Sequence, residues 1–382
     1  MSATLNAEVS KNPTIWLALE LAMSIWKVAF MAAGLKSPSV HDVEANDFDR
    51  LAALIELMRR RLGLPDGQVV IGYEAGRHGH YIARELTRRG YEVVELDSSS
   101  IERPRRKYAK SDKLDARALV LLLRDWREGR RQISRVHIPS LADEVDRDLH
   151  REREYWKKLK LQSSNRFESV LVRHGCSTKI KPKRSLKVAA ICDFRGEALP
   201  APVQAELQRL SDGVAHARAQ IKAIEAEQER LLSTTGREAA DAPRVKKLEM
   251  IEQLMALVAV GHHTAWILVQ EIFGWRVYAN HRQLSASVGL CPTPYNSGQT
   301  NREQGISKAG NAKVRALLIQ LAWRWLRKQP ESEPSKWFKE RFDHGTRSRK
   351  IGIVAVARRL TILLWRYLKN GELPANVQLK VA

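Results

Sequence analysis

The chain has 382 residues, which is enough for two or three domains at roughly 150 residues each. Lysine and arginine number 65 against 43 aspartate and glutamate residues, and the resulting net charge of +22 favours nucleic acid as a partner. Three scattered cysteines argue against a disulfide framework or a zinc site of paired cysteines, and the absence of a secretory leader and of a long apolar run argues against a membrane protein. We therefore expect a cytoplasmic protein with no membrane partner.

The first 130 residues alternate predicted strands with predicted helices. Residues 14–30 are expected to form two short apolar strands with a turn near Met23 and Ser24, because β-branched and aromatic residues are frequent there. The other expected elements are strands over residues 67–76 and 91–97 and helices over residues 43–63 and 80–90. Strands that alternate with helices predict an α/β layered domain over residues 1–130.

The middle segment, residues 131–240, is predicted to be helical and to contain a coiled coil. Residues 140–174 form a long, heavily charged helical pattern that ends at Gly175, and residues 176–200 are irregular and basic. Further along, residues spaced alternately by three and four form a seam, which consists of Leu207, Leu210, Val214, Ala217, Ile221, Ile224, Gln228 and Leu231. Such a seam needs a partner helix, which is either residues 140–174 of the same chain or the arm of a second copy.

Residues 241–382 are predicted to form an all-helical C-terminal domain. Its helices carry apolar stripes that indicate a core, for example Val314, Leu317, Leu318, Leu321 and Trp325. Two of the helices are separated by the segment CPTPYNSGQTNREQGISKAG, which has no obvious structure of its own. Loops of that length inside a compact domain are usually functional or disordered.

Four acidic residues of the first domain stand out by position. Glu20 lies in an apolar predicted strand, Glu74 lies at the end of another, and Asp112 and Asp115 lie three apart at a predicted helix start. Converging carboxylates repel one another unless a divalent cation neutralises them, and Mg²⁺ suits oxygen ligands beside phosphates. Two such ions about 4 Å apart can hold both oxygens of a phosphodiester displacement, so we expect a nuclease-type metal site. For Asp112 and Asp115 alone, the simpler interpretation is favourable charge at a helix N-terminus.

The C-terminal loop carries a Ser-Gly step and several cations. Ser297 precedes a glycine that lets the backbone approach a ligand closely, although most Ser-Gly steps are simply turns. The expected nucleic-acid-binding residues are Arg302, Lys308, Asn311 and Arg315, which include three cations and a helix start that can receive a phosphate. The other serines that could act as a nucleophile are Ser285, Ser287 and Ser307.

Four segments together carry a resemblance to a known family. They are YEAG, KSDKLDARAL, RDLHREREYWKKLKLQSSNRFESVLVRHG and VGLCPTPYNSGQTNREQGISKAGNAKVRALLIQLAW. In this set and order they resemble the DEDD transposases of the bacterial insertion-sequence family one-ten, eleven-eleven subgroup. The resemblance covers nearly the whole chain, and its most specific part is the order of the SG, GISKAGN and R elements.

The resemblance implies an RNase H-like (RuvC-like) N-terminal domain, a coiled-coil middle and a helical transposase domain. It also implies a transposase or recombinase that cleaves and exchanges DNA strands by metal-dependent strand transfer. In such a protein Glu20, Glu74, Asp112 and Asp115 would bind Mg²⁺, and Ser297 would attack the DNA phosphate to give a covalent phosphoserine. The family usually has aspartate where this chain has Glu20, so that ligand is one methylene longer.

The resemblance further implies the partners. These are double-stranded DNA at the element ends and at the target, a noncoding guide (bridge) RNA, and further copies of the chain in a dimer or tetramer joined through the coiled coil. The expected location is the nucleoid of a bacterial cell. Two alternatives stay open at this point, namely a junction-resolving metal-dependent endonuclease that uses water and a non-catalytic nucleic-acid-binding protein.

Overall fold

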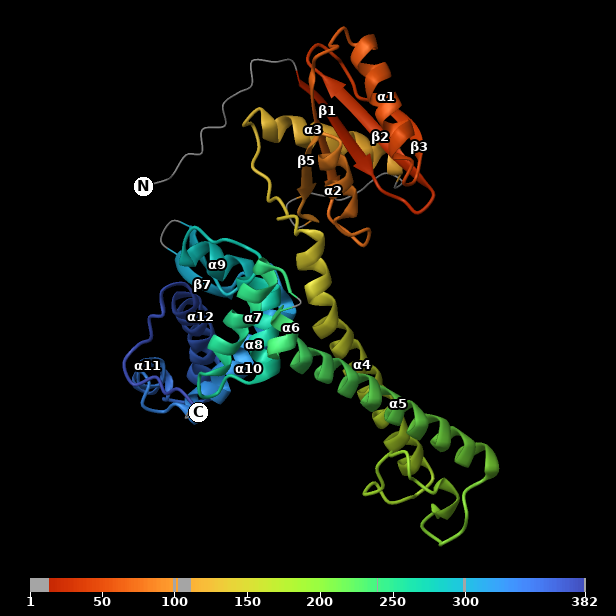
Figure 1. Cartoon of the computed structure of the whole chain (residues 1–382), viewed down its shortest axis with the longest axis vertical. Coiled ribbons are helices and arrows are strands. Elements are labelled where there is room, and N and C mark those ends of the chain that lie inside the picture. Colours follow the sequence, from red (N-terminus) through yellow and green to blue (C-terminus); the bar gives the residue numbers. More distant parts are fainter. Residues whose placement is uncertain (1–13, 99–100, 102–110, 239, 298–299, 381–382) are drawn as a thin grey trace. The chain divides into compact units, whose positions relative to one another are not determined.

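A computed structural model describes residues 14–98, 101, 111–238, 240–297 and 300–380 of the chain (Figure 1). The chain divides into two compact units, Met1–Leu141 and Ala142–Ala382. The fold combines one five-stranded mixed sheet with many helices, so the expected combination of an α/β part and a helical part is confirmed. Within the described ranges, no helix is long and apolar enough to cross a membrane.

The first unit is built on a five-stranded sheet. Its strands are β1 (Thr14–Glu20), β2 (Ile25–Ala32), β3 (Ser39–Glu44), β4 (Gln68–Glu74) and β5 (Glu92–Leu96). They lie in the order β3-β2-β1-β4-β5, with β1 antiparallel to β2 and parallel to β4, and β4 parallel to β5. The turn predicted between the first two strands is therefore confirmed.

Three helices cover this sheet. They are α1 (Phe48–Arg61), α2 (Tyr81–Arg88) and α3 (Asp112–Arg127). Side chains of α1 and α2 share one hydrophobic core with the sheet, and side chains of α3 share another. Because α1 and α2 belong to one core and α3 to the other, the sheet is covered on both faces.

The start of the first predicted helix is wrong. Helix α1 begins only at Phe48, after its N-cap Asp47 accepts a hydrogen bond from the backbone nitrogen of Arg50. The residues before it, up to Glu44, belong to β3, which was not predicted. Strand β3 is an edge strand in which only Val43 is buried, so its sequence lacks the apolar alternation that indicates a strand.

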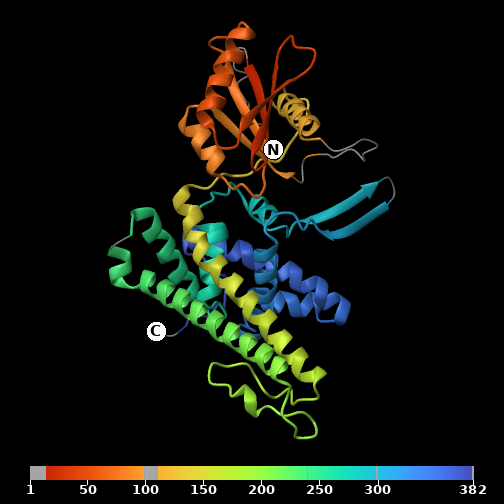
Figure 2. The ribbon, with the colours of Figure 1, turned by 90° about the vertical axis from the view of Figure 1, so that its right-hand side faces the viewer.

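Two long helices dominate the first part of the second unit. Helix α4 (Leu141–Arg173) and helix α5 (Ala201–Leu232) lie side by side (Figures 1 and 2). Ion pairs join them, for example Arg153 to Glu225 at 2.7 Å and Arg166 to Glu206 at 2.6 Å. The segment between the two helices contains the short η2 (Val188–Ala190) and packs against their ends around a small core of its own.

The predicted seam lies on α5 and is covered within the chain. All of its residues except Leu210 are buried, and Ser211 is buried in addition. Of the two partners that the seam allowed, the structure therefore has the helix of the same chain. A coiled-coil geometry and an association with a second copy stay predictions, and a second copy would have to contact other residues of the arm.

The remaining helices form a compact group around the largest core. They are α6 (Thr234–Glu238), α7 (Ala242–Met255), α8 (His262–Leu268), the π-helical η3 (Val269–Phe273), α9 (His281–Ser287), α10 (Ala312–Lys328), α11 (Glu333–Phe342) and α12 (Thr346–Asn370). The apolar stripe of α10 is confirmed as core, because Val314, Leu318, Leu321 and Trp325 are buried there and the partly buried Leu317 packs against them.

The expectation of an all-helical C-terminal part is wrong. Strands β6 (Pro292–Ser297) and β7 (Thr300–Ile306) form an antiparallel hairpin in the segment that was predicted to be a loop. Pro292 and Pro294 lack the backbone N–H that a central strand needs, and the register is irregular between them. Polar residues fill the second strand, so the sequence has no alternation of apolar residues that would have indicated the hairpin.

Candidate functional site

Two of the four predicted carboxylates lie at neighbouring strand ends. Glu20 is the last residue of β1 and Glu74 is the last residue of β4. The strands are adjacent and parallel, and their register pairs Leu19 with Tyr73, so the two glutamates that follow are level with each other. Both are half-buried. Carboxyl ends of parallel strands are a usual place for ligands in α/β folds.

Both glutamates project toward the face of the sheet that α3 covers. Side chains alternate along a strand, and Trp16, Ala18 and Val70, which have the same parity, belong to the core that α3 shares. The odd-numbered residues of these strands instead belong to the core shared with α1 and α2. The strand pleat therefore places Glu20 and Glu74 on one side of the sheet.

Helix α3 brings Asp112 and Asp115 toward the same edge. At mid-sheet the absent side chain of Gly72 makes room for Leu123, since a Cβ there would lie 3.0 Å from its methyl groups. Near the opposite edge, Arg127 at the helix end pairs with Glu92 at the start of β5 over 3.1 Å. The helix therefore runs antiparallel to the strands, and its first turn lies toward their carboxyl ends.

The four carboxylates share one side and one edge of the sheet, but they do not form a finished metal site. Among the described residues, no three side chains of Asp, Glu, His or Cys are grouped closely enough to hold a metal ion. Asp112 is exposed, whereas Asp115 is half-buried beside the core residue Ala116. Metal binding by this set therefore requires the side chains to converge further.

A buried acid that the sequence reasoning missed lies on the other face of the sheet. Glu95 in β5 is 2% exposed, and its Oε2 accepts a hydrogen bond from the Tyr73 hydroxyl at 3.3 Å and lies 2.8 Å from His80 Nδ1. Burial, together with the charge of Glu95, raises the pKa of Tyr73. The signal that singled out Glu20, an acid inside an apolar strand, applies equally to Glu95 and could have found it.

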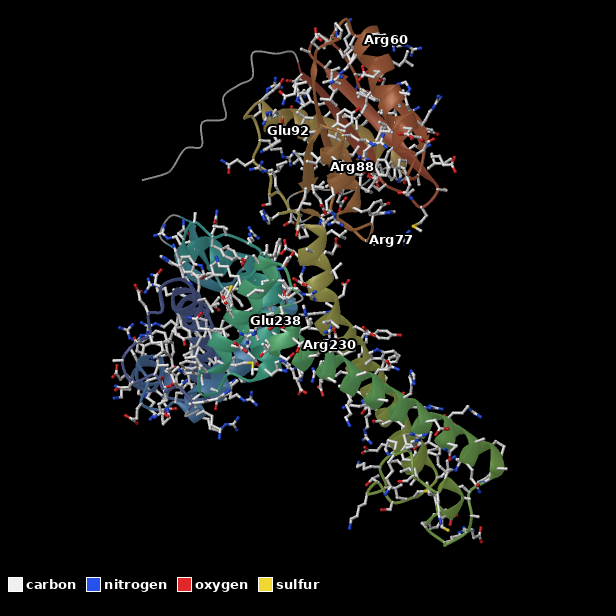
Figure 3. All side chains as sticks on the ribbon, viewed as in Figure 1. Arg60, Arg77, Arg88, Glu92, Arg230 and Glu238 are labelled. Atoms are coloured by element: carbon white, nitrogen blue, oxygen red, sulfur yellow. The ribbon has the colours of Figure 1, made fainter. Side chains whose placement is uncertain are left out.

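The segment between β4 and α2 adds basic residues at the carboxyl edge of the sheet. It contains Arg77, His78 and His80, and Arg77 is exposed at this loop (Figure 3). Arg77 follows Glu74, one of the predicted metal ligands, by three residues in the chain. Positive charge at that place suits the phosphates of a nucleic acid.

In the second unit, Ser297 is the last residue of β6 and pairs with Thr300 across the hairpin. The backbone of Ser297 lies at the far end of the hairpin, and the side chains of Ser297 and Arg302 lie outside the described part of the structure. Of the other serines, Ser285 is buried and the Ser287 hydroxyl donates a hydrogen bond to the Leu284 carbonyl at 2.8 Å.

Two glycines hold the base of the hairpin. Gly289 (φ +68°) and Gly310 (φ +77°) both adopt left-handed conformations that favour glycine. A Cβ at Gly289 would lie 2.0 Å from the Ala309 carbonyl oxygen, and one at Gly310 would lie 2.1 Å from the Ser287 carbonyl oxygen. The chain entering the hairpin and the chain leaving it are therefore in direct backbone contact.

The side chains of Asn311 and Arg315 are engaged at this base. Arg315 Nη1 donates hydrogen bonds to the carbonyls of Val288 at 3.1 Å and Ala309 at 3.2 Å. Asn311 Oδ1 caps α10 by accepting from the Val314 nitrogen, while its Nδ2 donates to Glu271. Lys308 is exposed, with φ 56°, in the segment between β7 and α10. Of the predicted nucleic-acid-binding residues with described side chains, Lys308 is the exposed one.

Comparison with known proteins assigns the family. The chain is 32% identical to the putative transposase y4rJ of Sinorhizobium fredii over 94% of this chain and 92% of that protein. Residues 251–335 match the model of the transposase IS116/IS110/IS902 family. The chain belongs to this family of transposases.

Other transposases are more distant relatives. This chain is 26% identical to the transposase for insertion sequence element IS1328 of Yersinia enterocolitica, over 66% of this chain and 70% of that protein. It is 31% identical to the transposase for IS1111A of Coxiella burnetii over about a third of each chain, 33% and 35%. The predicted membership of an insertion-sequence transposase family is thereby confirmed, and DNA transposition is the function that the family carries.

An ionic cluster that the sequence did not predict joins the segment matching the family model to α4. Glu271 in η3 lies 2.8 Å from His150 Nε2 and accepts hydrogen bonds from Arg151 at 2.9 Å and Asn311 at 3.1 Å. Burial alone would raise its pKa, but hydrogen bonds from His150 and Arg151 outweigh burial and lower the pKa to about 2. The cluster ties the start of α4 to the helix that follows the hairpin.

Proposed function

We propose that this transposase cleaves and exchanges the DNA strands of an insertion sequence with two sets of residues. The first is the carboxylate set of Glu20, Glu74, Asp112 and Asp115, and the second is Ser297. The observation that supports the proposal most is that Glu20 and Glu74 are level at neighbouring strand ends on the face covered by α3. The first turn of that helix carries the other two acids toward the same edge.

We further propose that the sheet belongs to an RNase H-like, RuvC-like fold. The order β3-β2-β1-β4-β5 with antiparallel first strands and helices on both faces supports this assignment. The four-residue set is then a DEDD-type site with glutamate in its first position. The IS1111A transposase among the relatives supports the eleven-eleven subgroup.

The donor set fits Mg²⁺ in chemistry, because it consists of carboxylate oxygens only. When bound, the metal would supply positive charge for the oxygens of a phosphodiester displacement. The chain's own residues would position it, with Glu20 and Glu74 held by adjacent strands and Asp112 and Asp115 held by the start of α3.

Ser297 is proposed as the nucleophile. Its hydroxyl oxygen would form a bond to phosphorus while the bond from phosphorus to the leaving deoxyribose oxygen breaks, giving a phosphoserine. The hydroxyl proton would leave to a base and the released strand end would take up a proton. A hydroxyl of another strand would then attack the phosphoserine, which releases the serine and joins the strands. Ser297 lies at the end of a hairpin whose two strands are held in close backbone contact near Gly289 and Gly310, and this position supports the assignment.

The net charge of +22 supports nucleic acid as a partner. We propose that, besides DNA at the element ends and target, the chain binds a noncoding guide RNA, and that the acting species is a dimer or tetramer. Sequencing of the nucleic acid that copurifies with the full chain tests the guide RNA directly. A discrete RNA supports it, and the absence of any enriched RNA contradicts it.

The carboxylate half of the proposal is tested by replacing Asp112 and Asp115 together with asparagine. We expect the loss of cleavage of element-end DNA in Mg²⁺ with unchanged DNA binding, because the asparagines keep the shape and remove the charge. The matched control is Asp66→Asn, since Asp66 is an exposed acid just before β4 at the opposite edge of the sheet. Full cleavage by the double variant would exclude the carboxylate site.

A further inference from the structure

A groove of about 470 Å³ lies between α10, α11 and the start of α12. Trp323, Leu326 and Arg327 line it from α10, and Phe338 and Lys339 line it from α11. Asp343 at the end of α11 and Arg349 of α12 close its remaining side. The groove is formed within the second unit and lies outside the carboxylate set and the serine hairpin.

The Trp323 side chain in this groove is unusually accessible. Trp323 is 41% exposed, more than any other tryptophan of the described residues, whereas Trp325 on the same helix is fully buried. The Trp323 ring meets the buried Phe338 ring edge to face, with centroids 6.4 Å apart and planes at 74°. Phe338 thus supports the indole while part of its surface stays open to a ligand.

The charge around the indole is positive. Arg327 and Lys339 are exposed, and in the described part of the chain no carboxylate forms an ion pair with either of them. The single acid that lines the groove, Asp343, is already paired with Arg349 at 3.4 Å. A ligand that combines a flat apolar group with negative charge matches this environment.

We propose that the groove binds an unpaired nucleotide, with its base stacked on Trp323 and its phosphates near Arg327 and Lys339. Stacking needs an accessible ring face, which a base has in a single strand and lacks inside a duplex. Trp323 lies 12 residues after Asn311 along α10, which is about 18 Å at 1.5 Å per residue. A strand held at the hairpin base can span that distance with a few nucleotides.

This site goes beyond the proposed function, because it requires neither a metal nor a serine nucleophile. Its occupant is single-stranded nucleic acid, and the chemistry of a base and its phosphates is common to DNA and RNA. Short oligonucleotides of one sequence, made as single-stranded DNA, as single-stranded RNA and as blunt DNA duplex, distinguish the sources. The type of oligonucleotide that binds more tightly, and whose binding depends on Trp323, identifies whether DNA or RNA occupies the groove.

The test compares the full-length chain with its Trp323→Ala and Trp323→Tyr variants by fluorescence anisotropy of labelled oligonucleotides. We expect Trp323→Ala to weaken single-strand binding by about 5- to 150-fold, the range for one lost stacking contact, while Trp323→Tyr retains most of it. Arg327→Ala and Lys339→Ala should each reduce the slope of affinity against salt by roughly 0.7. Duplex binding should be unchanged in the Trp323 variants.

Tyr155→Ala is the matched control, because Tyr155 is an exposed aromatic residue on α4 outside the groove. Equal single-strand binding by wild type and Trp323→Ala would overturn the proposal, as would an equal loss in the Tyr155 variant or an equal loss of duplex binding. If Trp323→Ala instead alters the oligomeric state in size-exclusion chromatography and leaves oligonucleotide binding intact, the groove binds protein and the proposal is wrong. Thermal unfolding verifies that each variant is folded.

Discussion

Glu271 and Asn311 are joined by a 3.1 Å hydrogen bond between the carboxylate Oε2 of the former and the amide Nδ2 of the latter. The same asparagine caps α10, and the same glutamate pairs with Arg151 of α4. The carboxylate of Glu271 therefore connects three segments of the chain. Asn311 follows it by 40 residues, and Arg151 precedes it by 120 residues. The hairpin that carries Ser297 starts and ends next to this connection.

Replacing Glu271 with glutamine should destabilise the second unit. The change keeps the shape but removes the charge that His150 and Arg151 face, so we expect a loss of about 1–3 kcal/mol in the free energy of unfolding. Differential scanning calorimetry measures the effect, and Glu249→Gln is the control because Glu249 is an exposed acid on α7. Equal melting temperatures for the Glu271 variant and wild type would show that the cluster does not hold the helices together.

The pKa of Glu271 is lowered from its ordinary value of 4.5 to about 2 in the folded chain, which predicts a pH dependence. A carboxyl whose folded pKa is lowered contributes stability that is complete above its unfolded pKa and is lost as the pH falls through the folded pKa. The contribution should therefore decrease from about pH 4.5 to about pH 2. Melting temperatures over this range should fall more steeply for wild type than for Glu271→Gln, and parallel curves would contradict the assignment.

Gly289→Ala should disturb the base of the hairpin and reduce strand cleavage. The new Cβ would meet the Ala309 carbonyl oxygen at 2.0 Å, and the left-handed φ adds backbone strain of about 1–2 kcal/mol. Gly305→Ala is the matched control, because Gly305 also has a positive φ but has open space around its Cβ position. We expect a larger drop in melting temperature and in cleavage for Gly289→Ala; equal effects would mean that the glycine contact does not position the hairpin.

Substitutions of Glu20 test whether the first proposed metal ligand needs a carboxylate and whether it needs the length of glutamate. Glu20→Gln should abolish cleavage, since an amide cannot supply the charge that a divalent cation requires. Glu20→Asp keeps the charge and shortens the side chain by one methylene, so it should retain part of the activity. Cleavage rates at several Mg²⁺ concentrations separate weaker metal binding from lost chemistry. Unchanged cleavage by Glu20→Gln would remove this residue from the site.

The strands and helices that could be predicted are those with a buried periodic pattern. Strands β1, β4 and β5 have apolar cores, and the stripe of α10 repeats at helical spacing, so both signals were legible in the sequence. Strand β3 and the β6–β7 hairpin were missed because edge position, proline and polar composition remove the alternation that identifies a strand. These strands form because they pair with neighbouring strands, and their own sequences do not indicate a strand.

In the candidate site, too, the residues that could be predicted are those with a local signal in the sequence. The sequence predicted Glu20 within the first strand, where an acid among apolar residues is conspicuous, and Glu74 at the end of another strand. The structure places both at strand ends. The Glu271 cluster was not, since it joins residues up to 121 positions apart and depends on a tertiary contact between α4 and η3. The engagement of Asn311 and Arg315 at the hairpin base likewise depends on contacts with α9 and η3 that no local pattern shows.

The proposed function requires that Ser297 becomes covalently attached to DNA. The most direct measurement incubates the full-length chain with end-labelled element-end DNA and Mg²⁺, separates the products on a denaturing gel, and maps the modified peptide by mass spectrometry. We expect a protein–DNA adduct with the phosphate on Ser297, which is absent in Ser297→Ala although that variant still binds DNA. An adduct on another residue, or cleaved and rejoined strands from Ser297→Ala, would contradict it.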